Sequence, residues 1–294
     1  MNNLIDTIYY FLYIVAELTL LFVGISTIVG IILMYIPEEK MNKWMSGKGI
    51  LGNVMGASVG SLTPFCACST VPMTLGFLEM GVSFGVVMSF VIASPLLNPI
   101  IIGMMATIMG LKVTAIYFLV TFVGAILFGV TLEKLGFKKY VKNVRMKGER
   151  HKDDVPLGFG LRFLKALKGA WEDYKSVLKY LLVGVGLGAA IYGYLPQEFL
   201  VKIAGPDNLF AIPVAAIIGV PLYVRAETAI PIGLSLMDKG MSTGAVIALI
   251  IGGAGMAIPE MTMLSSIFNK KLVAAMVVAI FLTATIGGFI FNLI

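Results

Sequence analysis

Long apolar stretches cover most of this chain, and one polar stretch divides them. The apolar blocks lie near residues 8–36, 50–63, 70–80, 83–109, 113–133, 177–195, 209–222, 229–237, 243–268 and 272–293. A helix needs about 20 mostly apolar residues to cross a bilayer, so the longest blocks predict transmembrane helices and the short blocks predict broken segments. The pattern predicts an all-α polytopic membrane protein with transmembrane regions at 1–133 and 176–294, joined by a polar region at 134–175.

Composition excludes a soluble globular protein. The chain is 59% hydrophobic and 13% charged, whereas soluble domains have about 45–50% apolar and about 25% charged residues. Most of the net charge of +6 lies in the 134–175 region, which the positive-inside rule places in the cytoplasm. We therefore expect no nucleic-acid partner. The apolar run at 8–36 is too long for a cleaved signal and predicts the first transmembrane helix.

The region at 134–175 has two parts. The first, KKYVKNVRMKGERHKDDV, is a solvated basic run that contains the single histidine, His151. The second has apolar residues at helical spacing, including Phe163, Leu167 and Trp171. It predicts an amphipathic helix that lies on the membrane surface and leads into the next span.

The two halves of the chain repeat one pattern. A shift of 159 residues aligns residues 35–98 with residues 194–257 without a gap. The matched pairs include Tyr35 and Tyr194, Pro37 and Pro196, Pro72 and Pro231, Gly81 and Gly240, and Ser83 and Ser242. Chance similarity of two apolar sequences does not match prolines, glycines and charges together, so we predict two structural repeats.

The orientation of the repeats depends on whether the first broken segment of each half crosses the membrane or re-enters. Re-entrant segments give each half an odd number of crossings and invert the halves, whereas crossing segments make them parallel. The inverted arrangement leaves only Lys112, Lys202 and Lys239 on the side opposite the basic loop. This agrees better with the positive-inside rule, so we predict inverted repeats. Short broken segments at matching places in two halves are typical of a transporter binding site.

The first broken segment, TPFCACSTVP, contains both cysteines of the chain, Cys66 and Cys68. Pro64 and Pro72 disfavour helix before them, and non-helical backbone at membrane depth must line protein or a water-filled cavity. In an extended turn both thiols would share one face. The hydroxyls of Thr63, Ser69 and Thr70 add polar groups to this candidate site.

Two sulfurs on one face suit a soft partner such as Cu(I), Zn(II) or a trivalent arsenical. A trivalent arsenic with one organic group has two further valences, which two thiolates would fill. Two alternatives stay open: the cysteines are small buried apolar residues, or they form a disulfide, which would be strained across a single residue.

The repeat aligns Cys66 with Arg225 and Cys68 with Glu227, in the segment VPLYVRAETAIP. Charged side chains at membrane depth are costly and normally face a bundle interior or an aqueous cavity. Arg225 and Glu227 are either a structural ion pair or substrate-binding groups, with Glu227 also a proton-coupling candidate. In inverted repeats, we expect the thiol turn and the charged turn to face each other near the midplane.

The next helix of each half is also broken. Asn98 lies in ASPLLNP, and Glu260 lies in GGAGMAIPE. Free backbone groups at such breaks bind ions or substrates, so Asn98 is a substrate-binding candidate and Glu260 a proton-coupling candidate. Glu260 could instead be a solvated residue near an interface. Glu17, in the first predicted helix, is a further proton-coupling candidate or a partner of Arg225.

These motifs resemble those of the ArsP-like permease family. The resemblance rests on TPFCACSTVP and SPLLNP in the first half and on VRAETAIP and IPE in the second, and it covers nearly the whole membrane part. Characterised members are plasma-membrane efflux permeases for trivalent organoarsenicals, which implies this activity and location here. Cys66 and Cys68 correspond to the family's cysteine pair. The family often has serine between them, where this chain has Ala67.

Together these features favour a secondary efflux permease for a small thiophilic solute. Nothing resembles an ATP-binding loop, so an ion gradient or the solute's own gradient would supply the energy. The alternatives are an importer or channel for a sulfur compound, an anion or a soft metal ion, and a membrane thiol–disulfide oxidoreductase. The oxidoreductase would need a redox partner and usually a quinone or a second cysteine pair. We expect no enzyme activity, cofactor or resident metal. The expected partners are the lipid bilayer and the solute, and a homo-oligomer stays open.

Overall fold

The described part of the chain is built of helices. The computed structural model describes residues 49–63, 67–142, 159–192, 210–222, 226–238 and 240–293, with single residues between 9 and 31. The first half contains α3 (Ile50–Leu62), α4 (Ala67–Glu79), α5 (Phe84–Leu96), α6 (Pro99–Ile108), α7 (Leu111–Lys134) and the 3-10 helix η1 (Phe137–Tyr140). The second contains α8 (Phe159–Tyr192), α10 (Ala211–Leu222), α11 (Ala226–Asp238), α12 (Thr243–Gly255), α13 (Ile258–Ile267) and α14 (Lys270–Asn292).

The helix lengths match a membrane protein with whole and broken spans. α7 and α14 have 24 and 23 residues with mean hydropathies of 2.3 and 2.4, enough to cross a bilayer. The pairs α5–α6 and α12–α13 are bent by 41° and 42° at their breaks. α3 and α10, with 13 and 12 residues, are too short to cross alone. The predicted all-α polytopic membrane fold is confirmed.

The helices of the two halves correspond in order and length. α4, α5 and α6 begin and end 159 residues before α11, α12 and α13, the shift found in the sequence. The turns after α4 and α11 also agree. Gly81 and Gly240 have φ angles of 79° and 100°, and in each turn the following N–H donates to the carbonyl five residues earlier at 3.0 Å. This is a Schellman helix end, which requires the left-handed backbone that glycine adopts readily.

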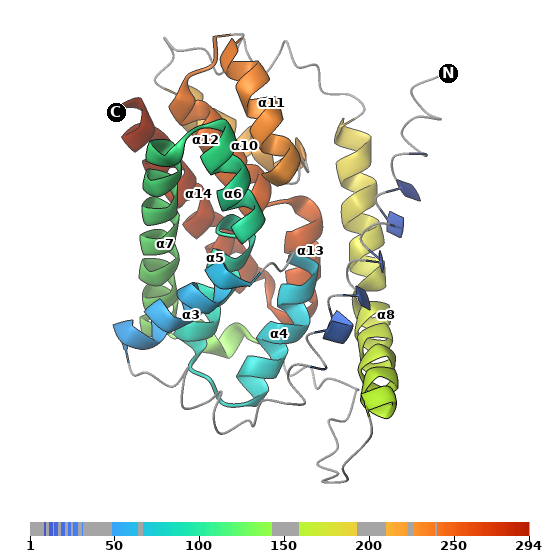
Figure 1. Cartoon of the computed structure of the whole chain (residues 1–294). Helices are drawn as coiled ribbons and strands as arrows, with labels where there is room; N and C mark the ends of the chain where they lie inside the picture. The colour runs from blue at the N-terminus through green and yellow to red at the C-terminus, as the bar shows by residue number, and fades with distance from the viewer. Residues whose placement is uncertain are drawn as a thin grey trace.

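The packing of the halves is reciprocal. α3 packs on α5 as α10 packs on α12, and α5 packs on α7 as α12 packs on α14. Between the halves, α4 packs against α13 whereas its counterpart α11 packs against α6, the counterpart of α13 (Figure 1). The equivalent helices α5 and α12 also touch each other, as do α7 and α14. Such exchanged contacts are typical of a two-fold relationship.

The helices α7 and α14 run antiparallel. A Cβ at Gly124 would lie 2.9 Å from Cγ2 of Thr283, and a Cβ at Gly287 would lie 3.2 Å from Cγ1 of Val120, so positions rise along one helix as they fall along the other. The chain beyond α7 also meets the start of α14, where the Asn269 N–H donates to the Tyr140 carbonyl at 2.9 Å.

α8 is one helix of 34 residues. It packs against α13 and stands at one edge of the molecule (Figure 1). The Tyr174 and Thr19 hydroxyls are 2.6 Å apart, which joins α8 to the N-terminal segment. The helix confirms the helical pattern after residue 159, while its predicted position on the membrane surface and the domain boundaries stay predictions.

Candidate functional site

The first break lies between α3 and α4. Thr63 ends α3 with extended backbone angles of φ −96° and ψ 122°, and α4 begins at Ala67. Pro64 and Cys66 lie outside the described residues, as do the side chains of Cys68 and Ser69, although their backbones belong to α4. The break is therefore shorter than the proline spacing predicted, and Cys68 is helical rather than extended.

The helix continues through Pro72 because α4 is held by tertiary packing. A proline inside a helix costs about 3 kcal/mol. Val71 and Phe77 of α4 are 3% and 1% exposed, and burying side chains of this size contributes about 1.5–3 kcal/mol each. Burial of α4 against α5 and α13 therefore offsets the preference of Pro72 for non-helical backbone.

Thr63 is directed back to its own helix. Its hydroxyl donates to the carbonyls of Val59 and Gly60, at 2.8 and 3.1 Å. A hydroxyl has one proton and two acceptor lone pairs. Thr63 is therefore available to a solute as an acceptor only.

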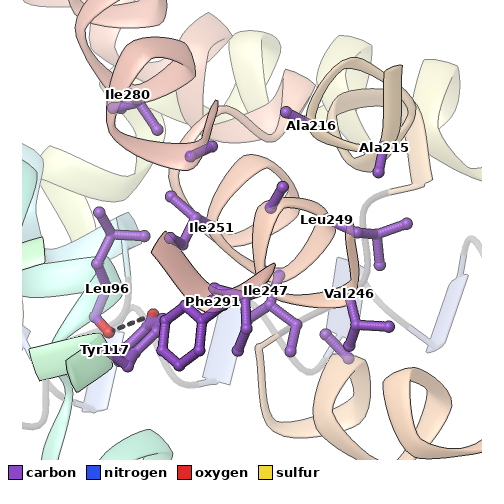
Figure 2. Packing of buried hydrophobic residues seen from close by; sticks show 14 of the residues in the cluster. Leu96, Tyr117, Ala215, Ala216, Val246, Ile247, Leu249, Ile251, Ile280 and Phe291 are labelled. Carbon is purple, nitrogen blue, oxygen red and sulfur yellow. Dashed lines mark hydrogen bonds between the residues drawn. The ribbon is translucent and has the colours of Figure 1, made fainter. Parts of the chain in front are cut away.

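The α5–α6 break lies in the interior. Pro95 is inside α5, and the Asn98 oxygen Oδ1 accepts from the Ile100 N–H at 2.9 Å, which caps α6. Asn98 is 7% exposed. The Tyr117 hydroxyl donates to the Leu96 carbonyl at 2.9 Å and so holds the end of α5 against α7 (Figure 2). The capping bond occupies the Asn98 oxygen and leaves its amide N–H groups for a ligand.

Glu260 lies in the first turn of α13, at the second interior break. Its side chain is 6% exposed, so the solvated alternative is wrong. A carboxylate in the first turn of a helix is favoured by the helix dipole. Sequence alone could not give this depth, because IPE also fits a helix that starts at the membrane surface.

The two interior breaks meet each other. A Cβ at Gly255, the last residue of α12, would lie 3.3 Å from Cδ2 of Leu96, the last residue of α5. These residues are equivalent in the repeat, being 159 positions apart. The contact therefore joins equivalent ends of α5 and α12, at the α5–α6 and α12–α13 breaks.

The helix after each outer break packs against the helix after the inner break of the opposite half. α4, which carries Cys68, packs against α13, which carries Glu260. α11, which carries Glu227, packs against α6, which Asn98 caps. Arg225, Glu17 and the side chain of Glu227 lie outside the described residues, so the expected meeting of thiol turn and charged turn stays a prediction. The structure packs the helix that contains Cys68 against the helix that contains the buried Glu260.

Several polar residues near these helices were missed by sequence reasoning. They are Asn53, Ser89, Ser94 and Tyr117, which are all at most 1% exposed. The sequence contained a signal for Ser94. The repeat aligns Ser94 with Gly253 and Pro95 with Ala254, so the hydroxyl and the proline occur in one half only. Within the described ranges, no group of three or more His, Cys, Asp or Glu side chains is placed to hold a metal ion.

Comparison with known proteins agrees with the motif resemblance. A model of an ArsP-type family, described as "Predicted permease", matches residues 3–293. UPF0718 protein YcgR of Bacillus subtilis is 26% identical over 266 residues, which cover 88% of this chain and 87% of YcgR. UPF0718 protein YraQ of Escherichia coli is 24% identical over 252 residues, which cover 84% of this chain and 70% of YraQ. No solved structure matches the chain.

Proposed function

Because the chain belongs to the ArsP-like family of predicted permeases, we propose that it is a secondary efflux permease for a small thiophilic solute, with trivalent organoarsenicals as its substrates. The permease function follows from the family. The choice of a thiophilic solute rests on Cys66 and Cys68 at a helix break. The packing of α4 against α13 carries the proposal, since it sets the helix that contains Cys68 against the helix that contains the buried Glu260.

The solute would bind by ligand exchange at arsenic. Each arsenic–oxygen bond of a monoorganyl arsenous acid is replaced by an arsenic–sulfur bond to Cys66 or Cys68, and each thiol proton leaves with the hydroxide as water. No electron is transferred and no second cysteine pair is required. Thr63, Pro64 and Ser69 of the same segment would add contacts to the solute, and Asn98 would donate its free amide N–H groups to it.

Charged residues at the breaks would couple binding to transport. Arg225 of the second broken segment would orient the solute or balance its charge. Glu260, Glu227 or Glu17 takes up a proton as access alternates. The burial of Glu260, which is 6% exposed, supports its part in this scheme, because ionisable residues inside membrane proteins commonly belong to ion or proton pathways.

Inverted repeats are part of this proposal. The antiparallel α7 and α14 are equivalent helices, each long enough to cross the membrane. This supports a two-fold axis that lies in the membrane plane, the arrangement in which alternating access occurs by rocking one repeat against the other. The basic loop after α7 would be cytoplasmic by the positive-inside rule, and the protein would reside in the cell membrane.

Uptake of trivalent methylarsenical into inside-out vesicles tests the function. Wild type should accumulate the arsenical, and Cys66→Ser/Cys68→Ser should not. Thr131→Ala, which alters an exposed hydroxyl on α7, is the matched control and should transport normally. Absence of uptake by folded wild type would reject the arsenical, whereas accumulation only in right-side-out vesicles would support the importer. Retained uptake in the double variant would reject the role of the thiols.

A further inference from the structure

Ser94 presents a buried hydroxyl that has no hydrogen-bond partner. The residue is 0% exposed, and its Oγ is one of the few buried side-chain oxygens in the described residues without a partner. An unsatisfied buried hydroxyl costs about 1–3 kcal/mol, so its place in the structure requires an explanation. It lies at the α5–α6 break, immediately before Pro95.

The same break has a backbone acceptor without its helical donor. Pro95 supplies no N–H to the Val91 carbonyl, since proline lacks the amide proton. Val91 is 2% exposed, so water does not satisfy its carbonyl freely. The Val91 carbonyl therefore lacks the amide donor that a helix without proline would offer it. The unpartnered Ser94 hydroxyl lies on the same helix. A cation is the ligand that such an arrangement favours.

The second half lacks these features at the equivalent place. Gly253 and Ala254 align with Ser94 and Pro95, so neither the hydroxyl nor the missing amide occurs there. The backbone packing is otherwise alike. A Cβ at Gly60 would lie 3.2 Å from the Ser94 nitrogen, and one at Gly219 would lie 2.7 Å from the Gly253 nitrogen. Ser94 and Pro95 are therefore additions to a shared scaffold.

Charge and access limit the kind of cation. Residues 91–99 contain no carboxylate, and divalent ions such as Ca²⁺ require several charged oxygens. Hydroxyl and carbonyl oxygens at broken helices suit a monovalent ion. Pro95 is the one partly exposed residue from 94 to 98, so the break is not wholly enclosed.

We propose that the α5–α6 break binds a monovalent cation, Na⁺ in the first instance, through Ser94 Oγ and the carbonyl oxygen of Val91. The site lies beside the Leu96–Gly255 contact at the centre of the molecule. An ion there would be held where the two halves meet. Its role as the coupling ion rests on the proposed transport function, but its binding does not.

Thermal unfolding of the purified full-length protein tests the binding. NaCl, KCl and choline chloride are compared at equal ionic strength. Wild type should show a saturable rise in melting temperature with NaCl, on the order of 2–4 °C, that choline does not produce. Ser94→Ala should abolish the rise or increase the half-saturating concentration at least about tenfold, which corresponds to about 1.4 kcal/mol.

Two further variants copy the residues of the second half. Ser94→Gly removes the hydroxyl, and Pro95→Ala restores the amide that occupies the Val91 carbonyl. Both should weaken the response to NaCl. Thr285→Val, which removes another unpartnered buried hydroxyl on α14, should keep it. These variants maintain the test if Ser94→Ala does not fold.

The opposite results overturn the site. If Ser94 is only an unsatisfied core hydroxyl or binds water alone, wild type will show no salt-specific shift. Ser94→Ala will then be equally or more stable in all three salts. A sodium response that survives in both Ser94 variants also rejects the proposal. Arsenical binding measured in choline chloride reports on the thiols separately, so failure of the cation site and failure of the proposed transport are distinguished.

Discussion

Gly124 of α7 lies against Thr283 of α14, and these two residues are equivalent positions of the two repeats, 159 apart. A Cβ at Gly124 would lie 2.9 Å from the Thr283 Cγ2 and 3.0 Å from its Oγ1. Both residues belong to the helices that are long enough to cross a membrane. The absence of a side chain at Gly124 in the first repeat thus leaves room for the Thr283 side chain of the second repeat.

Gly124→Val is expected to destabilise the protein by about 1–3 kcal/mol, because an overpacked site forces the helices apart. Thr283→Gly in the same chain should recover part of this loss by removing the opposing methyl group. The measurement is thermal unfolding in detergent. Gly103→Val on α6, where a Cβ would meet nothing within 4 Å, is the matched control and should change stability far less. Equal losses at both glycines would contradict the contact.

A second pair of equivalent contacts is polar in the first half of the chain and apolar in the second half. The Ser89 hydroxyl donates to the Asn53 oxygen Oδ1 at 2.8 Å beneath Gly129. Ile212 and Ala248, the equivalent residues of the second half, pack beneath Gly288 in the same way. One three-helix junction is therefore built with either a hydrogen bond or a hydrophobic contact.

This equivalence predicts strong coupling between positions 53 and 89. Ser89→Ala leaves the buried Asn53 oxygen unpaired and should cost about 1–3 kcal/mol. Asn53→Ile leaves the Ser89 hydroxyl unpaired and should cost a similar amount. The double variant Asn53→Ile/Ser89→Ala copies the second half and should lose less than the sum, with a coupling energy of about 0.5–3 kcal/mol. Additive losses in unfolding experiments would show that the two junctions are not equivalent.

Tyr117 supports the break between α5 and α6. Tyr117→Phe removes the donor to the Leu96 carbonyl, which is buried, and should destabilise the protein by about 1–3 kcal/mol. It should also slow transport, since the end of α5 is no longer held against α7. Tyr13→Phe, at a residue that is 58% exposed, should change stability by no more than about 0.5 kcal/mol. If the Tyr117→Phe variant were fully active and stable, packing alone would hold the end of α5 in place, and the prediction would be wrong.

The apolar blocks of the sequence and its internal repeat were sufficient to predict these helices. The apolar blocks 113–133 and 272–293 became α7 and α14, and the longer blocks 83–109 and 243–268 became the bent pairs. Helix formation in a membrane is dictated by local hydropathy and by the requirement that backbone groups pair within the segment. Both are properties of short stretches of sequence, which is why these predictions succeeded.

The contacts between the breaks could not be predicted in the same way. The repeat shows that α4 and α11 are equivalent, but not that α4 packs on α13 rather than on its own counterpart. That choice depends on the axis that relates the halves, a property of the folded molecule. The depth of Glu260 and the helical state of Cys68 depend on the same packing. Local rules for proline and charge therefore identified the broken segments but not the contacts between them.

The antiparallel arrangement of α7 and α14 predicts which chain ends share a side of the membrane. Single cysteines are introduced in a Cys66→Ser/Cys68→Ser background at Lys112, before the body of α7, and at Leu293, after α14. Two more replace Lys138 and Lys271, beside the junction where the Asn269 N–H meets the Tyr140 carbonyl. In inverted repeats, an impermeant maleimide added to intact cells should label positions 112 and 293 only. Inside-out vesicles should give the reverse pattern, because the basic loop is expected in the cytoplasm. Labelling of positions 112 and 271 from the same side would mean that α7 and α14 enter the membrane from that side and run parallel. This result would reject the inverted arrangement.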